Sequence, residues 1–227
     1  MIKLDKVSKK FGNGGIALSE VTLSIDRGEF VFFVGRTGSG KTTLFRLLIR
    51  EFFPSEGSII VGDFDLGNLP NYKIPHLRRK VGVVFQNLKL LSDRTIFENI
   101  VLPLEVSGFK DRDAHKRTEE IMQELGLSEH RDKFPIQLSG GELQRAAIAR
   151  ALVLSPEILL ADEPTGNLDP KTGEEILDLL MDINKKGTTV IMATHNDVMV
   201  NKFAKRVISL EKGKIIKDQK KGKYEIS

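Results

Sequence analysis

Short apolar runs, separated by amphipathic stretches, organise the chain. The run 30–34 ("FVFFV") leads into a glycine-rich stretch, and "LFRLLI" (44–49) follows with apolar residues on nearly every side. Three further apolar runs, at 81–85, 158–161 and 189–193, have the length of central strands. Buried strands that alternate with helices predict an α/β fold with a parallel core sheet covered on both faces.

The residues before the first buried strand have a different pattern. Val21, Leu23 and Ile25 alternate with polar neighbours, which is typical of a half-buried antiparallel strand, and Arg27 and Gly28 follow as a turn. Roughly the first 30 residues are therefore predicted to form a small antiparallel β layer beside the main sheet.

A helical pattern replaces the strand pattern after Phe85. In the stretch 111–126, side chains of one helical face are apolar or small, and a glycine ends the stretch. The residues on that face are Ala114, Thr118, Ile121, Met122 and Leu125. We expect residues 87–154 to form a helical sub-domain inserted in the core, within a single domain that spans 1–227.

A second clear helix follows Asp169. This residue can cap the helix, Pro170 suits its first turn, and Gly187 ends it. The apolar stripe of the helix consists of Ile176, Leu179, Leu180 and Ile183. The tail 211–227 is rich in lysine, which favours a frayed, solvated end over a dedicated lipid site.

Composition narrows the class of protein. With 227 residues, 40% of them hydrophobic, the chain can bury a substantial core. The 35 basic and 31 acidic residues are interspersed, which indicates an ordinary solvated surface, and we expect no nucleic-acid partner. The chain has no cysteine, so it has no disulfide, which is compatible with a reducing cytosol. No apolar run approaches the ~20 residues of a spanning helix, so we expect any membrane association to be peripheral.

The stretch "GRTGSGKTT" (35–43) fits the phosphate-loop pattern G-x-x-x-x-G-K-[ST]. In such a loop, backbone N–H groups and the following helix N-terminus offer partial positive charge. Lys41 reaches the terminal phosphates, and the Thr42 hydroxyl can bind magnesium. The alternative is a glycine-rich turn that contains Lys-Thr by chance. The position of the stretch between a buried strand and a helix favours the phosphate loop.

Polar side chains close three of the other predicted strands. Asp162 and Glu163 end "ILLADE", His195 follows "TVIMAT", and Gln86 follows "VGVVF". Taken alone, each is typical of a solvated turn or a structural residue. Beside a phosphate loop, Asp162 is expected to hold magnesium and Glu163 to polarise a water. Gln86 and His195 both lie at the carboxyl edge of the predicted parallel sheet, where open α/β folds bind ligands.

The stretch "LSGGELQRAAIARAL" (138–152) is the most specific of all. Ser139, Gly140 and Gly141 open a predicted helix, so its start offers a hydroxyl and bare N–H groups to an anion. A simple N-cap and turn is the alternative. Because the helix itself does not need the glycine pair, we favour a second phosphate-contacting surface.

Together these stretches resemble the ATP-binding subunits of ABC transporters, over essentially the whole chain. "GRTGSGKT" resembles the Walker A loop, Gln86 the Q-loop, "LSGGE" the signature, "ILLADE" the Walker B strand, "NLD" the D-loop and His195 the switch histidine. Phe11 lies where the family has an aromatic residue that stacks on adenine. That residue is usually tyrosine, so the stacking ring is kept and the hydroxyl is not.

The resemblance implies ATP and Mg²⁺ as cofactors and an ATP-hydrolysing enzyme. It implies catalytic roles for Glu163, His195 and Gln86, and Mg²⁺ contacts from Thr42, Gln86 and Asp162. The residues implied to bind ATP are Phe11, Gly35, Arg36, Thr37, Gly38, Ser39, Gly40, Lys41, Thr42 and Thr43. Those implied to face the ATP of a partner subunit are Ser139, Gly140, Gly141 and Glu142 of the signature, with Asn167, Leu168 and Asp169 of the D-loop.

The family mechanism implies a head-to-tail homodimer with ATP between the Walker A face of one subunit and the signature of the other. It also implies a separate membrane protein, with the ATPase on the cytoplasmic face of the membrane. "NLKLLSDRTIFENIVLPL" is rich in apolar residues, which fits either core packing or a groove for a helix of that partner.

Within the family, "ADEPTGNLDP" resembles cell-division, lipoprotein-releasing and macrolide-exporting ATPases. "SDRTIFENI", "FPIQLSGGE" and "MATHN" are most similar to the cell-division group, the FtsE type, which works with the membrane protein FtsX to activate cell-wall hydrolases.

The alternatives left open are a lipoprotein-releasing or macrolide-export subunit, and a switch that docks with ATP without hydrolysing it. The signature argues against a nucleotide kinase. The chain length argues against a DNA-repair ABC protein, which needs a long coiled-coil or zinc-bearing insertion.

Overall fold

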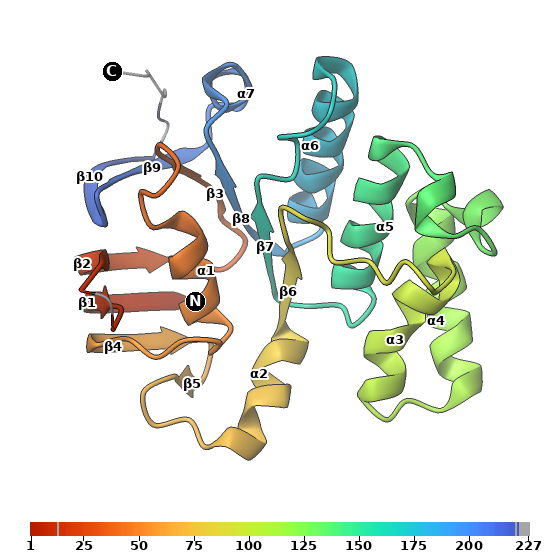
Figure 1. Cartoon of the computed structure of the whole chain (residues 1–227), viewed down its shortest axis with the longest axis horizontal. Coiled ribbons are helices and arrows are strands. Elements are labelled where there is room, and N and C mark those ends of the chain that lie inside the picture. The colour runs from red at the N-terminus through yellow and green to blue at the C-terminus, as the bar shows by residue number, and fades with distance from the viewer. Residues whose placement is uncertain (13, 221, 223–227) are drawn as a thin grey trace.

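The computed structural model describes residues 1–12, 14–220 and 222 of the chain and has the α/β architecture that the sequence predicts (Figure 1). The strands are β1 (Ile2–Lys10), β2 (Ile16–Ile25), β3 (Phe30–Val34), β4 (Glu56–Val61), β5 (Phe64–Asp65), β6 (Val81–Val84), β7 (Ile158–Asp162), β8 (Thr189–Thr194), β9 (Arg206–Glu211) and β10 (Lys214–Gln219). The helices are α1 (Lys41–Leu48), α2 (Ile74–Lys80), α3 (Ile96–Val106), α4 (Asp111–Glu124), α5 (Gly140–Leu152), α6 (Pro170–Lys185) and α7 (Asp197–Phe203).

The core sheet has the strand order β10-β9-β3-β8-β7-β6. The pairs from β9 to β6 are parallel, and β10 adds an antiparallel strand at one edge. Every residue of β3, β7 and β8 is buried, as expected where both faces of a parallel sheet are covered. The predicted parallel core is confirmed.

Side chains of β3 alternate between two hydrophobic clusters. Phe30, Phe32 and Val34 pack with α3, α5 and α6, whereas Val31 and Phe33 pack with α1 and the antiparallel sheet. In Figure 1 the core sheet accordingly stands between the antiparallel sheet with α1 on one side and the long helices on the other. This packing fixes β3, and with it the loop that follows, from both faces.

The antiparallel sheet has the order β2-β1-β4-β5. Leu4 pairs with Leu23 and Ile2 with Ile25, and all four side chains are buried. The predicted N-terminal layer is confirmed, but its strands β4 and β5 were not predicted. They are short and interrupted by glycine, so the sequence carries a weak period-2 pattern there.

The helices between β6 and β7 form a group of their own. The face of α4 that the sequence predicts is buried from Ala114 to Leu125. Helix α6 begins as predicted, because Asp169 accepts hydrogen bonds from the N–H groups of Lys171 and Thr172, both at 3.1 Å. Gly187, with φ 106°, follows its end.

The prediction of a frayed tail, made for residues 211–227, is wrong for residues 211–219. These residues belong to the hairpin β9–β10, in which Arg206 donates to both carboxylate oxygens of Asp218 at 2.9 and 2.7 Å. The turn of this hairpin contacts the phosphate loop, because the N–H of Gly213 donates to the carbonyl of Ser39 at 3.0 Å. The carbonyl of Gly213 accepts a hydrogen bond from the N–H of Ser19 at 2.9 Å. The hairpin thus joins the loop to β2. The rest of the tail, 221 and 223–227, lies outside the described residues.

Across the residues that the structure describes, no helix is both long enough and apolar enough to cross a membrane.

Candidate active site

The phosphate loop connects β3 to α1 in a conformation that requires glycine. Gly40, the N-cap of α1, has φ 111°, and a Cβ there would lie 2.6 Å from the carbonyl oxygen of Ala17. Gly35 likewise lies against the carbonyl of Leu210. The loop is therefore pressed against the backbone of β2 and β9, and its position depends on both sheets.

Lys41 is turned into the loop. Its Nζ donates to the carbonyl oxygens of Gly35 at 2.5 Å and Arg36 at 3.3 Å, and it lies 3.9 Å from Oε1 of Glu163. Burial lowers the pKa of Lys41 from its ordinary value, while the carboxylates of Glu163 and Asp162 oppose this. The result is a buried ammonium group among oxygen atoms where the loop would surround phosphates.

Thr42 and Asp162 meet across the site. The Thr42 hydroxyl donates to Oδ2 of Asp162 at 2.7 Å, and Oδ1 of Asp162 is buried without a hydrogen-bond partner among the described residues. Burial raises the pKa of Asp162, and the Thr42 hydrogen bond and the Lys41 charge partly offset that rise. A hydroxyl beside an unsatisfied carboxylate oxygen suits a hard divalent cation.

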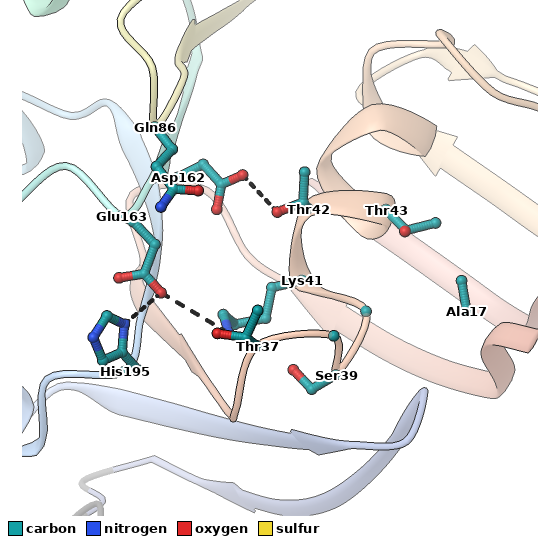
Figure 2. A pocket seen from close by; sticks show the side chains of 12 residues that line it. Ala17, Thr37, Ser39, Lys41, Thr42, Thr43, Gln86, Asp162, Glu163 and His195 are labelled. Atoms are coloured by element: carbon teal, nitrogen blue, oxygen red, sulfur yellow. Dashed lines mark hydrogen bonds and ion pairs between the residues drawn. The ribbon is translucent and has the colours of Figure 1, made fainter. Parts of the chain in front are cut away.

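Glu163 has an unusual backbone conformation. Its φ is 51°, in the left-handed region, and its N–H donates to the carbonyl of Ala193 at 2.9 Å. A non-glycine residue held there costs about 1–3 kcal/mol, which makes it a candidate functional position. The carboxylate points toward both the loop and His195, whose Nδ1 lies 2.9 Å from Oε1 (Figure 2). Only 11% of the Glu163 side chain is exposed, against 63% of His195.

The predicted side chains at the strand ends come together with the loop around one cavity of about 190 Å³ (Figure 2). Its lining consists of Ala17, Thr37, Gly38, Ser39, Gly40, Lys41, Thr42, Thr43, Gln86, Asp162, Glu163 and His195. The hydroxyl of Ser39 is a second buried polar atom without a partner in the described part of the chain. The sequence did not indicate Ala17. This residue lies on β2 and lines the cavity because the backbone of β2 packs against the loop at Gly40.

The signature residues do not line this cavity in the same chain. Ser139 caps α5: its hydroxyl and N–H both donate to Oε2 of Glu142 at 2.7 Å, and the N–H of Glu142 donates back to the hydroxyl oxygen at 3.4 Å. Nε2 of His130 lies 2.7 Å from Oε1 of the same carboxylate. Hydrogen bonds from Ser139 and His130 lower the pKa of Glu142 to about 2. The Ser139 hydroxyl is thus held in a defined place at the helix N-terminus.

Helix α5 does need its glycine pair for packing, so the prediction that the helix does not need the pair is wrong. A Cβ on Gly141 would lie 2.6 Å from Cγ2 of Thr172, and one on Gly140 would lie 3.1 Å from Cδ2 of Leu168. Glycine lets the start of α5 approach the segment before α6 closely. The pair has a packing reason within the chain as well as any role toward a ligand.

The remaining predicted residues lie outside the cavity. Asn167 and Asp169 are exposed, Leu168 is partly buried beside α5, and Asp169 also caps α6. Phe11 is 37% exposed and packs edge-on against Phe52, with ring centroids 5.5 Å apart. An exposed aromatic face of this kind can stack on a flat ring.

Most apolar side chains in the segment after Gln86 are used for core packing. Ile96 and Phe97 are buried, and Leu88 and Leu90 pack against the helical cluster. Leu91 is 40% exposed. Core packing therefore accounts for four of these five apolar side chains.

Known proteins share this arrangement of elements. A family model described as "ABC transporter" matches residues 18–166. The cell division ATP-binding protein FtsE of Bacillus subtilis is 46% identical over 99% of this chain and 98% of its own length. The protein of the same name from Escherichia coli K12 is 42% identical over 94% of this chain and 96% of its own length.

Solved structures agree with the sequence comparisons. The ATP-binding cassette MJ0796, a dimer in a post-hydrolysis state bound to ADP and Pi, is 36% identical with a TM-score of 0.88. The similarity covers 99% of this chain and all of that one. A second dimeric structure of MJ0796, called a bacterial ABC transporter cassette, is 37% identical over 99% of this chain and all of that chain, again with a TM-score of 0.88.

Proposed function

The chain belongs to the ABC transporter family and is an ATP-binding protein of the FtsE type, and from this premise we propose how its site works. It binds ATP and hydrolyses it to ADP and phosphate, as the ATPase subunit of a cell-division complex. The observation that carries the mechanism is the convergence of Lys41, Thr42, Asp162, Glu163 and His195 on one cavity. The sites, the metal and the individual partners below are our proposals.

The residues present fit a magnesium ion. The structure offers the Thr42 hydroxyl, the unsatisfied Oδ1 of Asp162 and the side chain of Gln86. Within the described residues, no group of three His, Asp or Glu side chains gathers as a metal site. Mg²⁺ characteristically takes one or two carboxylates and completes its shell with phosphate oxygens and water. When bound with ATP, the ion would neutralise charge on the β- and γ-phosphates.

The protein groups have separate roles in hydrolysis. Loop N–H groups and Lys41 hold the phosphates, and Phe11 offers a ring for adenine. Glu163 accepts a hydrogen bond from the attacking water and orients it, since its carboxylate is largely buried and lies 3.9 Å from the Nζ of Lys41, the group that would hold the terminal phosphate. His195 holds that carboxylate through Nδ1, and most of its side chain is exposed.

The complete site needs a second copy of the chain. Ser139 to Glu142 lie outside the cavity of their own chain, which supports their use by ATP bound to a partner subunit. The similar cassette MJ0796 is a dimer, which is a further argument for a head-to-tail homodimer. In it, Asn167, Leu168 and Asp169 would lie beside both sites.

For the membrane side, we infer an FtsX-like protein as partner and, through it, control of a cell-wall hydrolase. The ATPase would then act at the cytoplasmic face of the membrane as a peripheral subunit, with residues 87–154 as the helical sub-domain that meets the partner. This inference depends on the similarity to FtsE proteins along nearly the whole chain.

Recovery of the partner tests the proposal. Tagged Glu163→Gln protein would be purified from native membranes in detergent with magnesium and ATP, and co-purifying proteins identified by mass spectrometry. An FtsX-like protein is the expected result. Lipoprotein-releasing or efflux components would instead place the chain with a sister group. An ATPase rate equal in wild type and Glu163→Gln would favour a docking switch over a hydrolase.

A further inference from the structure

Arg150 connects the signature helix to the segment that follows Gln86. It lies on α5, near the end opposite Ser139 and about 16 Å along the helix axis from it. Its Nη1 donates to the carbonyl oxygen of Lys89 at 2.7 Å, and its Nη2 donates to that of Leu88 at 2.6 Å. One planar guanidinium therefore binds two consecutive backbone carbonyls.

Those two carbonyls belong to an unusual turn. Leu88 and Lys89 both have left-handed backbones, with φ of 53° and 51°, although neither is glycine. Such residues keep this conformation only where surrounding contacts impose it. Leu88 is partly buried against the helical cluster, and its N–H donates to the carbonyl of Phe85 at 2.9 Å. The turn thus begins directly at the end of β6, around Gln86.

A second side chain holds the far end of the segment. Asn99 of α3 is fully buried, accepts from the N–H of Leu91 at 2.7 Å, and donates to the carbonyl of Thr95 at 2.9 Å. Asn99 therefore fixes the end that leads into α3. The end that carries Gln86 depends on Arg150.

The hydrogen-bond partners of Arg150 indicate that it does more than pack α5. Among the described residues it has no carboxylate partner, and burial lowers the pKa of its guanidinium from the ordinary value. An apolar side chain of similar length could pack α5 without losing hydration. A guanidinium has a fork of donors that matches two neighbouring carbonyls, which an apolar side chain does not offer.

We propose that Arg150 is a positioning residue for Gln86 and ties it to the signature helix. This inference rests on the proposed function, in which Gln86 contacts Mg²⁺ and α5 begins at the ATP of the partner subunit. In the head-to-tail dimer, one helix then touches both ATP sites. Its first turn faces the partner's nucleotide, and Arg150 holds Gln86 at the chain's own nucleotide.

Amide hydrogen exchange in the nucleotide-free chain tests the positioning directly. In Arg150→Ala, we expect the amides of Leu88 and Lys89 to exchange about tenfold faster or more, because the turn loses the contacts that impose it, whereas the amide of Leu91 stays held by Asn99. Arg117→Ala is the matched control. Arg117 also donates to a backbone carbonyl, that of Val153 at 3.3 Å, but away from Gln86. Unchanged exchange at Leu88 and Lys89 in Arg150→Ala would overturn the proposal.

Kinetics test whether Arg150 acts through Gln86. Arg150→Ala should lower kcat about tenfold, with KM for ATP within about twofold, since it alters orientation rather than nucleotide binding. In a Gln86→Ala background, adding Arg150→Ala should lower kcat by less than about twofold more, because residues that act as one unit are not additive. Multiplying effects would overturn the proposal. Arg117→Ala should retain the wild-type kcat.

A conservative variant separates positioning from loss of folding. Arg150→Lys keeps the charge but has no fork, so we expect a kcat between those of wild type and Arg150→Ala. If Arg150→Ala does not fold, Arg150→Lys and Arg150→Gln carry the same exchange test. A wild-type chain without ATPase activity would contradict the proposed function alone, because the exchange measurement does not depend on hydrolysis.

Discussion

Glu163 and His195 meet through a contact of 2.9 Å between Oε1 and Nδ1, although they follow different strands of the core sheet. Both strands, β7 and β8, are parallel neighbours, so their carboxyl ends bring the two side chains to one edge. The left-handed backbone of Glu163 then turns its carboxylate back toward the loop and Lys41.

Replacing Glu163 with glutamine should separate binding from turnover. Glu163→Gln keeps the shape of the side chain but not its negative charge, so kcat should fall by about 10²- to 10⁴-fold while ATP still binds. Steady-state phosphate release and equilibrium nucleotide binding measure the two effects. Glu174→Gln, an exposed acid on α6, is the control and should match wild type. Normal steady-state turnover by Glu163→Gln would remove Glu163 from the mechanism.

Removing the Thr42 hydroxyl should weaken magnesium binding. Thr42→Val has nearly the same volume but leaves Asp162 without its 2.7 Å hydrogen bond. We expect the Mg²⁺ concentration for half-maximal ATPase activity to rise about tenfold, as for other changes around a metal site. Thr42→Ser restores the hydroxyl and should behave like wild type. An unchanged magnesium midpoint in Thr42→Val would exclude the hydroxyl as a ligand.

Substitution by alanine should destabilise the protein more at Gly141 than at Gly140. Gly141→Ala places a Cβ 2.6 Å from Cγ2 of Thr172, so we expect it to destabilise the protein by about 1–3 kcal/mol through overpacking. Gly140→Ala meets only the end of the Leu168 side chain at 3.1 Å, which can move, so its effect should be smaller. Urea unfolding measures both. Equal stability of the two variants would show that α5 can shift away from Thr172.

The charge of Glu142 should make one part of the stability depend on pH. Ser139 and His130 hold the pKa of this carboxyl at about 2 in the folded chain, below its usual 4.5. A depressed pKa stabilises the fold above the unfolded value, so this contribution is complete above pH 4.5 and is lost as pH falls toward 2.

Urea unfolding of wild type and Glu142→Gln at several pH values measures that contribution. The difference in unfolding free energy should be constant near neutral pH and should shrink in acid. Other carboxylates titrate in both proteins and cancel in the difference. A difference that does not vary with pH would mean that Ser139 and His130 bind the amide as well as the carboxylate.

The parallel core was predictable because strands buried on both faces leave continuous apolar runs, such as Phe30 to Val34. The meeting of Asp162, Glu163, Gln86 and His195 followed from the same order, since parallel strands end at one edge. The phosphate-loop pattern and the strand ends together therefore predicted every residue that lines the cavity except Ala17.

What the sequence missed depends on contacts between distant segments. Strand β9 has buried Val207, Ile208 and Leu210, and Gly213 in the following turn is a hairpin signal that was available. The lysines of β10 obscured this hairpin signal. They are present because one edge of that strand faces solvent. Two contacts leave no local pattern in the sequence, because each joins residues far apart in the chain. They are the close approach of Gly141 to Thr172 and the hydrogen bonds of Arg150 to the turn after Gln86.

The partners of β3 also have a consequence for how the protein is made. Both strands that flank it, β8 and β9, come from the last part of the chain, and the β9–β10 turn that holds Ser39 comes later still. Synthesis proceeds from the amino terminus, so the ribosome produces the phosphate loop long before its supports. Until then, both edges of β3 are unpaired, and the loop lacks the hydrogen bond from Gly213 to Ser39. The nucleotide site is therefore assembled only after β8, β9 and the β9–β10 turn have been synthesised.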